Sequence, residues 1–90
     1  MPKPVENFVF TEHALLETKQ RGIIENEVAA VLAKPEQSEP IRPGRMVYQI
    51  KLIFGELPKK YILRVFVDID RNPPQVVTAY RSSKIEKYWR

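Results

Sequence analysis

The spacing of hydrophobic residues changes from a helical period to a period of two about halfway along the chain. The first part predicts a helix from Thr11, a good N-cap, to about Arg21, and Gly22 is a typical helix stop. A second helix is predicted over about Glu25–Ala33, with Pro35 preventing its continuation. The linker between the two helices is so short that they are expected to form a tight helical hairpin.

The second half of the chain reads as sheet, because every second residue is apolar and Gly and Pro interrupt the pattern at intervals. The pattern predicts three strands, over residues 45–54, 60–68 and 75–81, with turns at 55–59 and 70–74. The segments outside these elements give weaker signals. Asn7–Phe10 is a short extended entry strand at best, Pro35–Pro43 reads as a loop, and residues 82–90 as a short helix or an extended tail.

Two helices followed by antiparallel strands indicate an α+β fold. We expect one domain over residues 1–90, with the helical hairpin packed on one face of a three- to four-stranded, mainly antiparallel sheet. The other face of the sheet is expected to be partly open.

The composition excludes several classes of protein. With 90 residues, 43% hydrophobic and 29% charged, the chain suits one small globular core rather than a disordered segment. It has no cysteine, so disulfides and thiolate chemistry are excluded. It also has no apolar run typical of a signal peptide or a membrane helix, so we expect a soluble, cytoplasmic protein with no membrane partner.

Charge is distributed unevenly along the chain. Residues 1–39 carry four Lys/Arg and seven Glu, a net of −3, whereas residues 40–90 carry eleven Lys/Arg and four Asp/Glu, a net of +7. The basic half is also the half with the predicted sheet, which favours a polyanionic partner such as RNA. A small domain with an excess of lysine explains the same numbers equally well.

Most familiar catalytic arrangements are missing from the sequence. The three glycines are isolated, so there is no phosphate-binding loop, and one histidine does not build a usual zinc site. Asp68 and Asp70 lie beside Asn-Pro-Pro and are more typical of a turn than of a metal site. The sequence therefore predicts no cofactor and no metal.

Metal-free cleavage of RNA remains possible, because RNA carries its own nucleophile, the 2′-OH. The catalytic candidates are His13, Arg21, Arg64, Tyr80 and Lys84. His13, Glu17 and Arg21 recur every four residues on one side of the first helix, so Glu17 is placed to hold His13 in one tautomer. The alternatives are a solvated His13 beside an exposed ion pair, or a His13 that braces the sheet.

Arg64 and Phe66 lie on the same face of a predicted strand, opposite the apolar row, and basic and aromatic residues on an open sheet can bind nucleic acid. The nucleic-acid-binding candidates are Arg45, Lys51, Arg64, Phe66, Thr78 and Arg81. A cross-strand salt bridge with a packed side-chain stem is the alternative for Arg64.

Several stretches carry a family resemblance: His13-Ala14, Arg21-Gly22-Ile23 about eight residues on, and the strand VVTAYRSSK at residues 76–84. Nearly the whole chain resembles a small bacterial family, domain of unknown function 4258, which is similar in layout to the RelE/ParE-like and BrnT-like toxins. That resemblance implies two helices followed by a sheet, and metal-independent ribonuclease activity. Family members commonly carry an arginine where this chain has Glu17, which leaves Arg21 as the only phosphate-binding arginine on the helix.

The sequence is therefore compatible with two functions of different classes. The first is a ribonuclease of the toxin type, in which His13 is the general acid or base, Arg21 and Arg64 bind the phosphate, and Tyr80 and Lys84 assist. The resemblance implies that such a protein has an inhibitory, antitoxin-like partner. The second is a non-catalytic module whose basic sheet face binds nucleic acid or an acidic protein.

The chain end and the assembly state stay open at this point. Tyr88 and Trp89 either fold back on the core or form a contact patch for another protein. The sequence predicts no oligomeric state.

Overall fold

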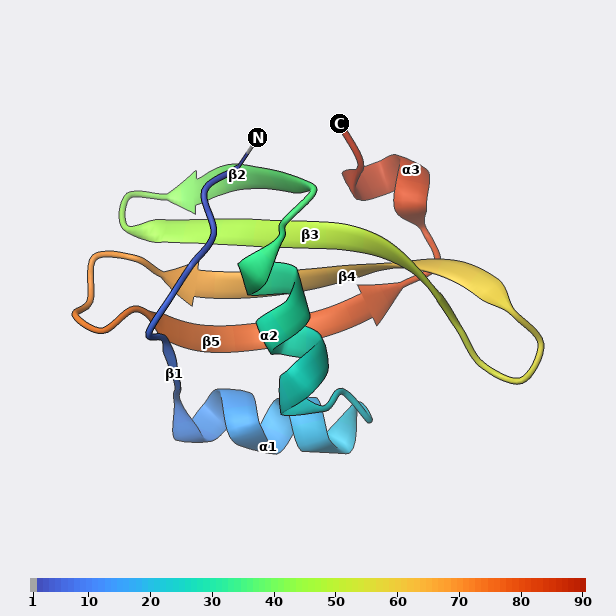
Figure 1. Cartoon of the computed structure of the whole chain (residues 1–90), viewed down its shortest axis with the longest axis horizontal. Helices are drawn as coiled ribbons and strands as arrows, with labels where there is room; N and C mark the ends of the chain where they lie inside the picture. Colours follow the sequence, from blue (N-terminus) through green and yellow to red (C-terminus); the bar gives the residue numbers. More distant parts are fainter. Residues whose placement is uncertain (1) are drawn as a thin grey trace.

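The computed structural model describes residues 2–90, which form three helices and five strands. In chain order these are β1 (Val9–Phe10), α1 (Glu12–Gln20), α2 (Glu25–Ala33), β2 (Gln37–Arg42), β3 (Arg45–Phe54), β4 (Lys59–Asp68), β5 (Gln75–Ser82) and α3 (Ile85–Tyr88). The α+β class is confirmed, and two helices precede the long strands. They cross each other rather than lie side by side, so the expected tight helical hairpin on one sheet face is wrong (Figure 1). No helix within residues 2–90 has the length and apolar character needed to cross a membrane.

The strands form one sheet in the order β1-β5-β4-β3-β2, with β1 parallel to β5 and all other neighbours antiparallel. Figure 1 shows α2 crossing one face of this sheet, while α1 lies along the edge formed by β5. The expected count of three to four strands is therefore wrong, since the described residues form five.

The additional long strand is β2, which lies in the segment predicted to be a loop. Pro40 is accommodated because β2 is the last strand of the sheet, where a missing N–H leaves no partner unpaired. The register also shifts between Pro40 and Arg42, as is typical of a bulge at a sheet edge.

The two helices begin and end for local reasons that the sequence shows. The Oγ1 of Thr11 accepts a hydrogen bond from the Ala14 backbone N–H at 3.0 Å, which caps α1. The chain turns into α2 through Gly22 at φ 69°, a left-handed conformation that a side chain would disfavour. The predicted bounds of α2, Glu25–Ala33, match those of the structure.

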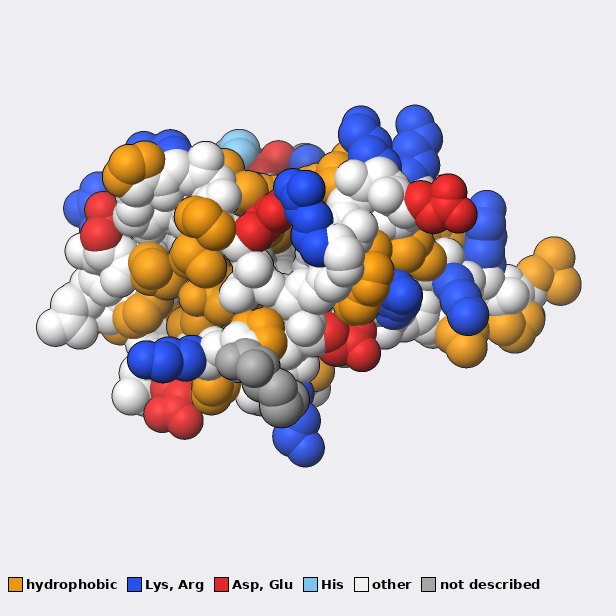
Figure 2. All heavy atoms as spheres, turned by 90° about the horizontal axis from the view of Figure 1, so that it is seen from above, with side chains coloured by type: hydrophobic (Ala, Val, Ile, Leu, Met, Phe, Trp, Pro, Cys, Tyr) orange, Lys and Arg blue, Asp and Glu red, His pale blue; other side chains and the backbone are white. Residues whose placement is uncertain are grey.

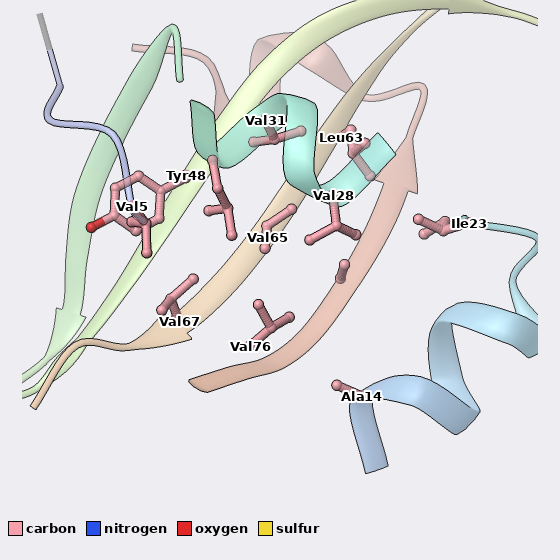
Figure 3. Packing of buried hydrophobic residues seen from close by; sticks show 12 residues of the cluster. Val5, Ala14, Ile23, Val28, Val31, Tyr48, Leu63, Val65, Val67 and Val76 are labelled. Carbon is pink, nitrogen blue, oxygen red and sulfur yellow. The ribbon is translucent and has the colours of Figure 1, made fainter. Parts of the chain in front are cut away.

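The core lies between the helices and one face of the sheet (Figure 3). Its fully buried members from α2 are Val28, Val31 and Leu32, and Leu63 and Val65 of β4 face them. Because neighbouring strand residues point to opposite faces, Arg64 lies on the other side of the sheet. We call that side the rear face.

The hairpin of β3 and β4 extends beyond its neighbouring strands. β2 pairs with β3 only as far as Gln49, and β5 pairs with β4 only as far as Ile62. The β3–β4 pairing continues to Phe54 and Lys59. The result is a two-stranded ribbon that projects from the sheet, seen in Figure 1 as the long loop on the right.

Candidate functional site

The carboxylate of Glu17 joins three of the side chains at the centre of the candidate site. Its Oε1 lies 3.0 Å from Nε2 of His13 and accepts a hydrogen bond from Oγ1 of Thr78 at 2.7 Å. Its Oε2 accepts one from Nη2 of Arg21 at 3.1 Å. The predicted stripe of His13, Glu17 and Arg21 along one side of α1 is therefore closed into a network by a residue from the sheet.

The same contacts fix α1 to the exposed edge of β5. The Nη1 of Arg21 donates to Oγ1 of Thr78 at 3.1 Å and to the backbone oxygen of Ala79 at 2.9 Å. The imidazole of His13 stays open, with 72% of its side chain exposed, whereas Glu17 is only 21% exposed. His13 is thus a solvent-accessible imidazole held by a mostly covered carboxylate.

The electrostatics of this network favour a charged Glu17. The hydrogen bond from Thr78, followed by the charges of Arg21 and His13, lowers the pKa of the Glu17 carboxyl below its usual range. A charged Glu17 carboxylate is suited to orient the imidazole beside it.

A hollow of about 440 Å³ adjoins this network. It is lined by two arginines and three aromatic residues: Arg21, Phe54, Tyr61, Tyr80 and Arg81. We call it the arginine–aromatic hollow. Such a lining offers flat rings for bases and positive charge for phosphates, the two features that single-stranded nucleic acid uses. Arg21 belongs both to this hollow and to the Glu17 network.

Arg64 lies on the rear face and is almost completely covered, with 7% of its side chain exposed. Its Nε donates to Oε1 of Gln49 at 2.9 Å and its Nη1 to the Tyr80 hydroxyl at 2.8 Å. Its Nη2 lies 3.5 Å from Oε1 of Glu39, and the Tyr88 ring centroid lies 4.2 Å from its Cζ. The Arg64 guanidinium, predicted from the sequence to bind phosphate, is therefore already hydrogen-bonded and covered by groups of the protein itself.

Aromatic rings surround the Tyr80 hydroxyl. Tyr80 stacks on Phe66 with centroids 5.8 Å apart, and Tyr88 meets it edge-on at 6.1 Å. Burial raises the pKa of Tyr80 above its ordinary value, which keeps the hydroxyl protonated at neutral pH. The hydrogen bond with Tyr80 lowers the pKa of Tyr88.

The C-terminal residues fold back over the rear face. The backbone oxygen of Tyr88 accepts from Nε2 of Gln49 at 3.0 Å, and Nη2 of Arg90 lies 2.8 Å from Oε2 of Glu39. Tyr88 and Trp89 are both half-buried in this arrangement. Residues 84–90 therefore cover part of the face that was expected to be open.

The other candidate residues make no side-chain contact with Glu17 in this structure. Arg45 makes two hydrogen bonds to Asp68, at 2.6 and 3.1 Å, and Nζ of Lys51 lies 4.1 Å from the Trp89 ring centroid. Arg81 donates to the Arg21 backbone oxygen at 2.9 Å and so holds the turn between α1 and α2 to β5. Lys84 lines a different hollow, next to α3.

Two residues important for this geometry were not singled out from the sequence. Gln49 and Glu39 bond to Arg64 from two different strands, and only the strand register brings them together. Gln49 is only 1% exposed. The only sign of this in the sequence is its position in the middle of a predicted strand, on the mostly polar face.

Comparison with known proteins gives one match. Residues 10–81 match a family model described as "Domain of unknown function (DUF4258)". No curated protein and no solved structure matches the chain significantly.

Proposed function

Because the chain belongs to the DUF4258 family, described only as a domain of unknown function, we propose from the site's own chemistry that it is a metal-independent endoribonuclease. The observation that carries this proposal is the Glu17 carboxylate, which holds an exposed histidine and an arginine side by side. A base, a cation and a nearby proton donor are what cleavage at a 2′-OH requires. The order of elements, helices before sheet, also suits a RelE-like toxin with an antitoxin-like partner.

His13 is the general base in this proposal. Its Nε2 lies 3.0 Å from the Glu17 carboxylate, so a proton on Nε2 leaves the lone pair of Nδ1 for substrate. Nδ1 takes the 2′-OH proton, the 2′-oxygen attacks the adjacent phosphorus, and the bond from phosphorus to the 5′-oxygen breaks. The products are a 2′,3′-cyclic phosphate and a free 5′-hydroxyl.

In this proposal Arg21 stabilises the charge on the phosphate, and Tyr80 protonates the leaving group. The Arg21 side chain is 42% exposed, so its open edge faces the phosphate as negative charge develops there. Tyr80 donates its hydroxyl proton to the departing 5′-oxygen, and the His13 imidazolium then returns a proton to Tyr80 through solvent. Arg64 supports Tyr80 through the 2.8 Å hydrogen bond to its oxygen and acts as a positioning residue.

The proposal is tested by incubating the wild-type protein and the His13→Ala variant with RNA in excess EDTA. We expect cleavage that yields 2′,3′-cyclic phosphate ends, and a loss of about 10²–10⁴-fold in kcat for His13→Ala with little change in KM. Gln20→Ala, an exposed change on the same helix, serves as the control and is expected to cut at the wild-type rate.

The outcomes separate the parts of the proposal. Equal cleavage by wild type and folded His13→Ala would retain the nuclease and reject His13 as its base. Absence of cleavage by wild type on a broad set of RNAs would reject the enzyme. Tyr80→Phe keeps the aromatic stack and removes the proton donor, so a loss in kcat is expected. The change also removes an acceptor of the buried Arg64, so kcat is compared under conditions where the variant is shown to be folded.

A non-catalytic RNA-binding module is the second candidate, and one observation favours it. Arg21, Arg64 and Arg81 all donate to protein acceptors in this structure, so each also has a purely structural task. In that case His13 and Arg21 brace the helices against the sheet. Salt-sensitive RNA binding without cleavage is the result that favours the module.

A further inference from the structure

We propose that a second hollow, beside α3, binds the phosphates of a single RNA strand on one side of the cleaved bond. This hollow has a volume of about 620 Å³ and is lined by Lys59, Lys60, Ser83, Lys84, Ile85, Glu86 and Lys87. We call it the lysine hollow. The inference rests on the proposed ribonuclease function, since it names the part of the substrate that this surface would hold.

The charge of the lysine hollow is not neutralised by the protein. Four lysines and one glutamate line it, a net of +3. Within residues 2–90, none of these four lysines lies within ion-pair distance of a carboxylate. Like charges held together repel, so a bound polyanion stabilises this arrangement. Figure 2 shows Lys and Arg side chains gathered toward the end of the molecule that carries α3 and the ribbon.

The lysine hollow adjoins the arginine–aromatic hollow. Nζ of Lys59 lies 6.0 Å from the ring centroid of Tyr61, which lines the other hollow. Arg81 and Ser83, two residues apart in the chain, line one hollow each. One strand that enters the arginine–aromatic hollow can therefore continue with its phosphates among the lysines.

The lining fits RNA better than an acidic protein. Protein interfaces usually have an apolar centre, and Ile85 is the one aliphatic side chain in the lining. The exposed aliphatic residues of this end, Ile53 and Leu57, belong instead to the ribbon. Flexible lysines without apolar anchors are typical of contacts to a phosphate backbone, which give affinity without reading sequence.

The test uses a variant in which Lys60, Lys84 and Lys87 are all changed to Gln. Lys3, Lys19 and Lys34 are exposed and lie elsewhere, so changing those three to Gln gives a control with the same net charge. The probes are 2′-O-methyl oligouridylates of about 4 and about 12 nucleotides, within the range of known single-strand sites. They lack the 2′-OH, so binding is measured without cleavage, by filter binding at several salt concentrations.

We expect the wild-type protein and the control to bind the longer probe more tightly than the shorter one. The Lys60/Lys84/Lys87 variant should lose about tenfold in affinity for the longer probe, and the slope of log affinity against log salt should fall by about 2. Affinity for the shorter probe should change less, because fewer of its phosphates can reach the lysine hollow while it occupies the arginine–aromatic hollow.

The proposal is overturned if the variant and the control bind the longer probe equally, or if polyglutamate of matched charge binds the wild type as tightly as RNA does. The result is independent of catalysis. Lysine-dependent binding in a protein that never cuts RNA would keep this site and reject the ribonuclease. Cleavage by the lysine variant with an unchanged KM would keep the ribonuclease and reject the lysine hollow as an RNA site.

Discussion

At the scale of single residues, two carboxylates hold arginines in different surroundings. Glu17 is bound by Thr78 and Arg21 at the candidate site, and Asp68 is bound by Arg45 at the far end of β4. Hydrogen bonding from Arg45 lowers the pKa of Asp68 below its usual range. A carboxyl whose pKa is lower in the folded than in the unfolded chain makes stability depend on pH.

The Asp68–Arg45 pair is expected to stabilise the protein by about 1 kcal/mol at neutral pH, because both side chains are mostly covered and two hydrogen bonds join them. This contribution is present above the unfolded pKa and is lost as pH falls through the lower, folded pKa. Urea unfolding of wild type and Asp68→Asn should therefore differ by about 1 kcal/mol at pH 7, and the difference should begin to shrink as pH falls below about 4.

Glu56→Gln, in the exposed turn of the ribbon, is the control for that comparison. It should track wild type at both pH values. A gap between wild type and Asp68→Asn that stays constant down to pH 2 would show that the pair does not titrate as described.

Spacing in the sequence was enough to place His13, Glu17 and Arg21 on one side of a helix, since residues four apart in a helix are neighbours. It was not enough to find the acceptor role of Glu17 toward Thr78, which is 61 residues away in the chain. The contacts of Arg64 were likewise out of reach, because its partners come from three other elements and the strand register decides which side chains face it.

At the scale of elements, the rear face depends on Gln49. Its amide accepts from Arg64 and donates to Gln37 and to the backbone oxygen of Tyr88, so it links β3 to β4, to β2 and to the chain end. Within residues 2–90, no buried side-chain nitrogen or oxygen lacks a hydrogen-bond partner. Removing the Gln49 amide would leave the buried Nε of Arg64 without its hydrogen-bond acceptor.

Gln49→Leu is expected to lower the free energy of unfolding by about 2–3 kcal/mol, although leucine is similar in size. The cause is the buried Nε of Arg64, which loses its acceptor. Chemical denaturation measures the loss. Gln49→Glu keeps that acceptor and should lose less than Gln49→Leu, and equal losses in the two variants would argue against this explanation.

The elements with a clear period were predictable from the sequence, and those without one were not. The alternation along β3 and β4 placed their apolar faces toward the helices, and apolar residues at helical spacing followed by Pro35 placed α2. β2 was missed because its segment lies among three prolines, a composition that favours a loop unless the strand is at an edge.

At the scale of the whole molecule, the main hydrophobic core is on one side of the sheet and the polar network is on the other. The helices cover the first side with short aliphatic residues, and the arginine and tyrosine cluster with the chain end covers part of the second. Stability is therefore expected to depend mainly on the helix side, which buries the larger apolar area.

Leu32→Ala tests that expectation, because Leu32 is fully buried between α2 and the sheet. We expect a loss of about 3 kcal/mol in the free energy of unfolding from the lost burial and the cavity left behind. Leu16→Ala, whose wild-type side chain is 56% exposed on α1, should cost less than about 1 kcal/mol. Thermal or urea unfolding of the two variants in parallel gives the comparison.

The fold-back of the chain end also gives the protein an optical probe. Trp89 is the only tryptophan in the sequence, and its ring lies 4.1 Å from the Lys51 ammonium on the rear face. Its fluorescence therefore reports whether residues 84–90 are docked, while circular dichroism reports the helices of the opposite side. Release of the chain end before the core unfolds would appear as an emission change at lower urea than the loss of ellipticity, and coincident transitions would show that both sides unfold together.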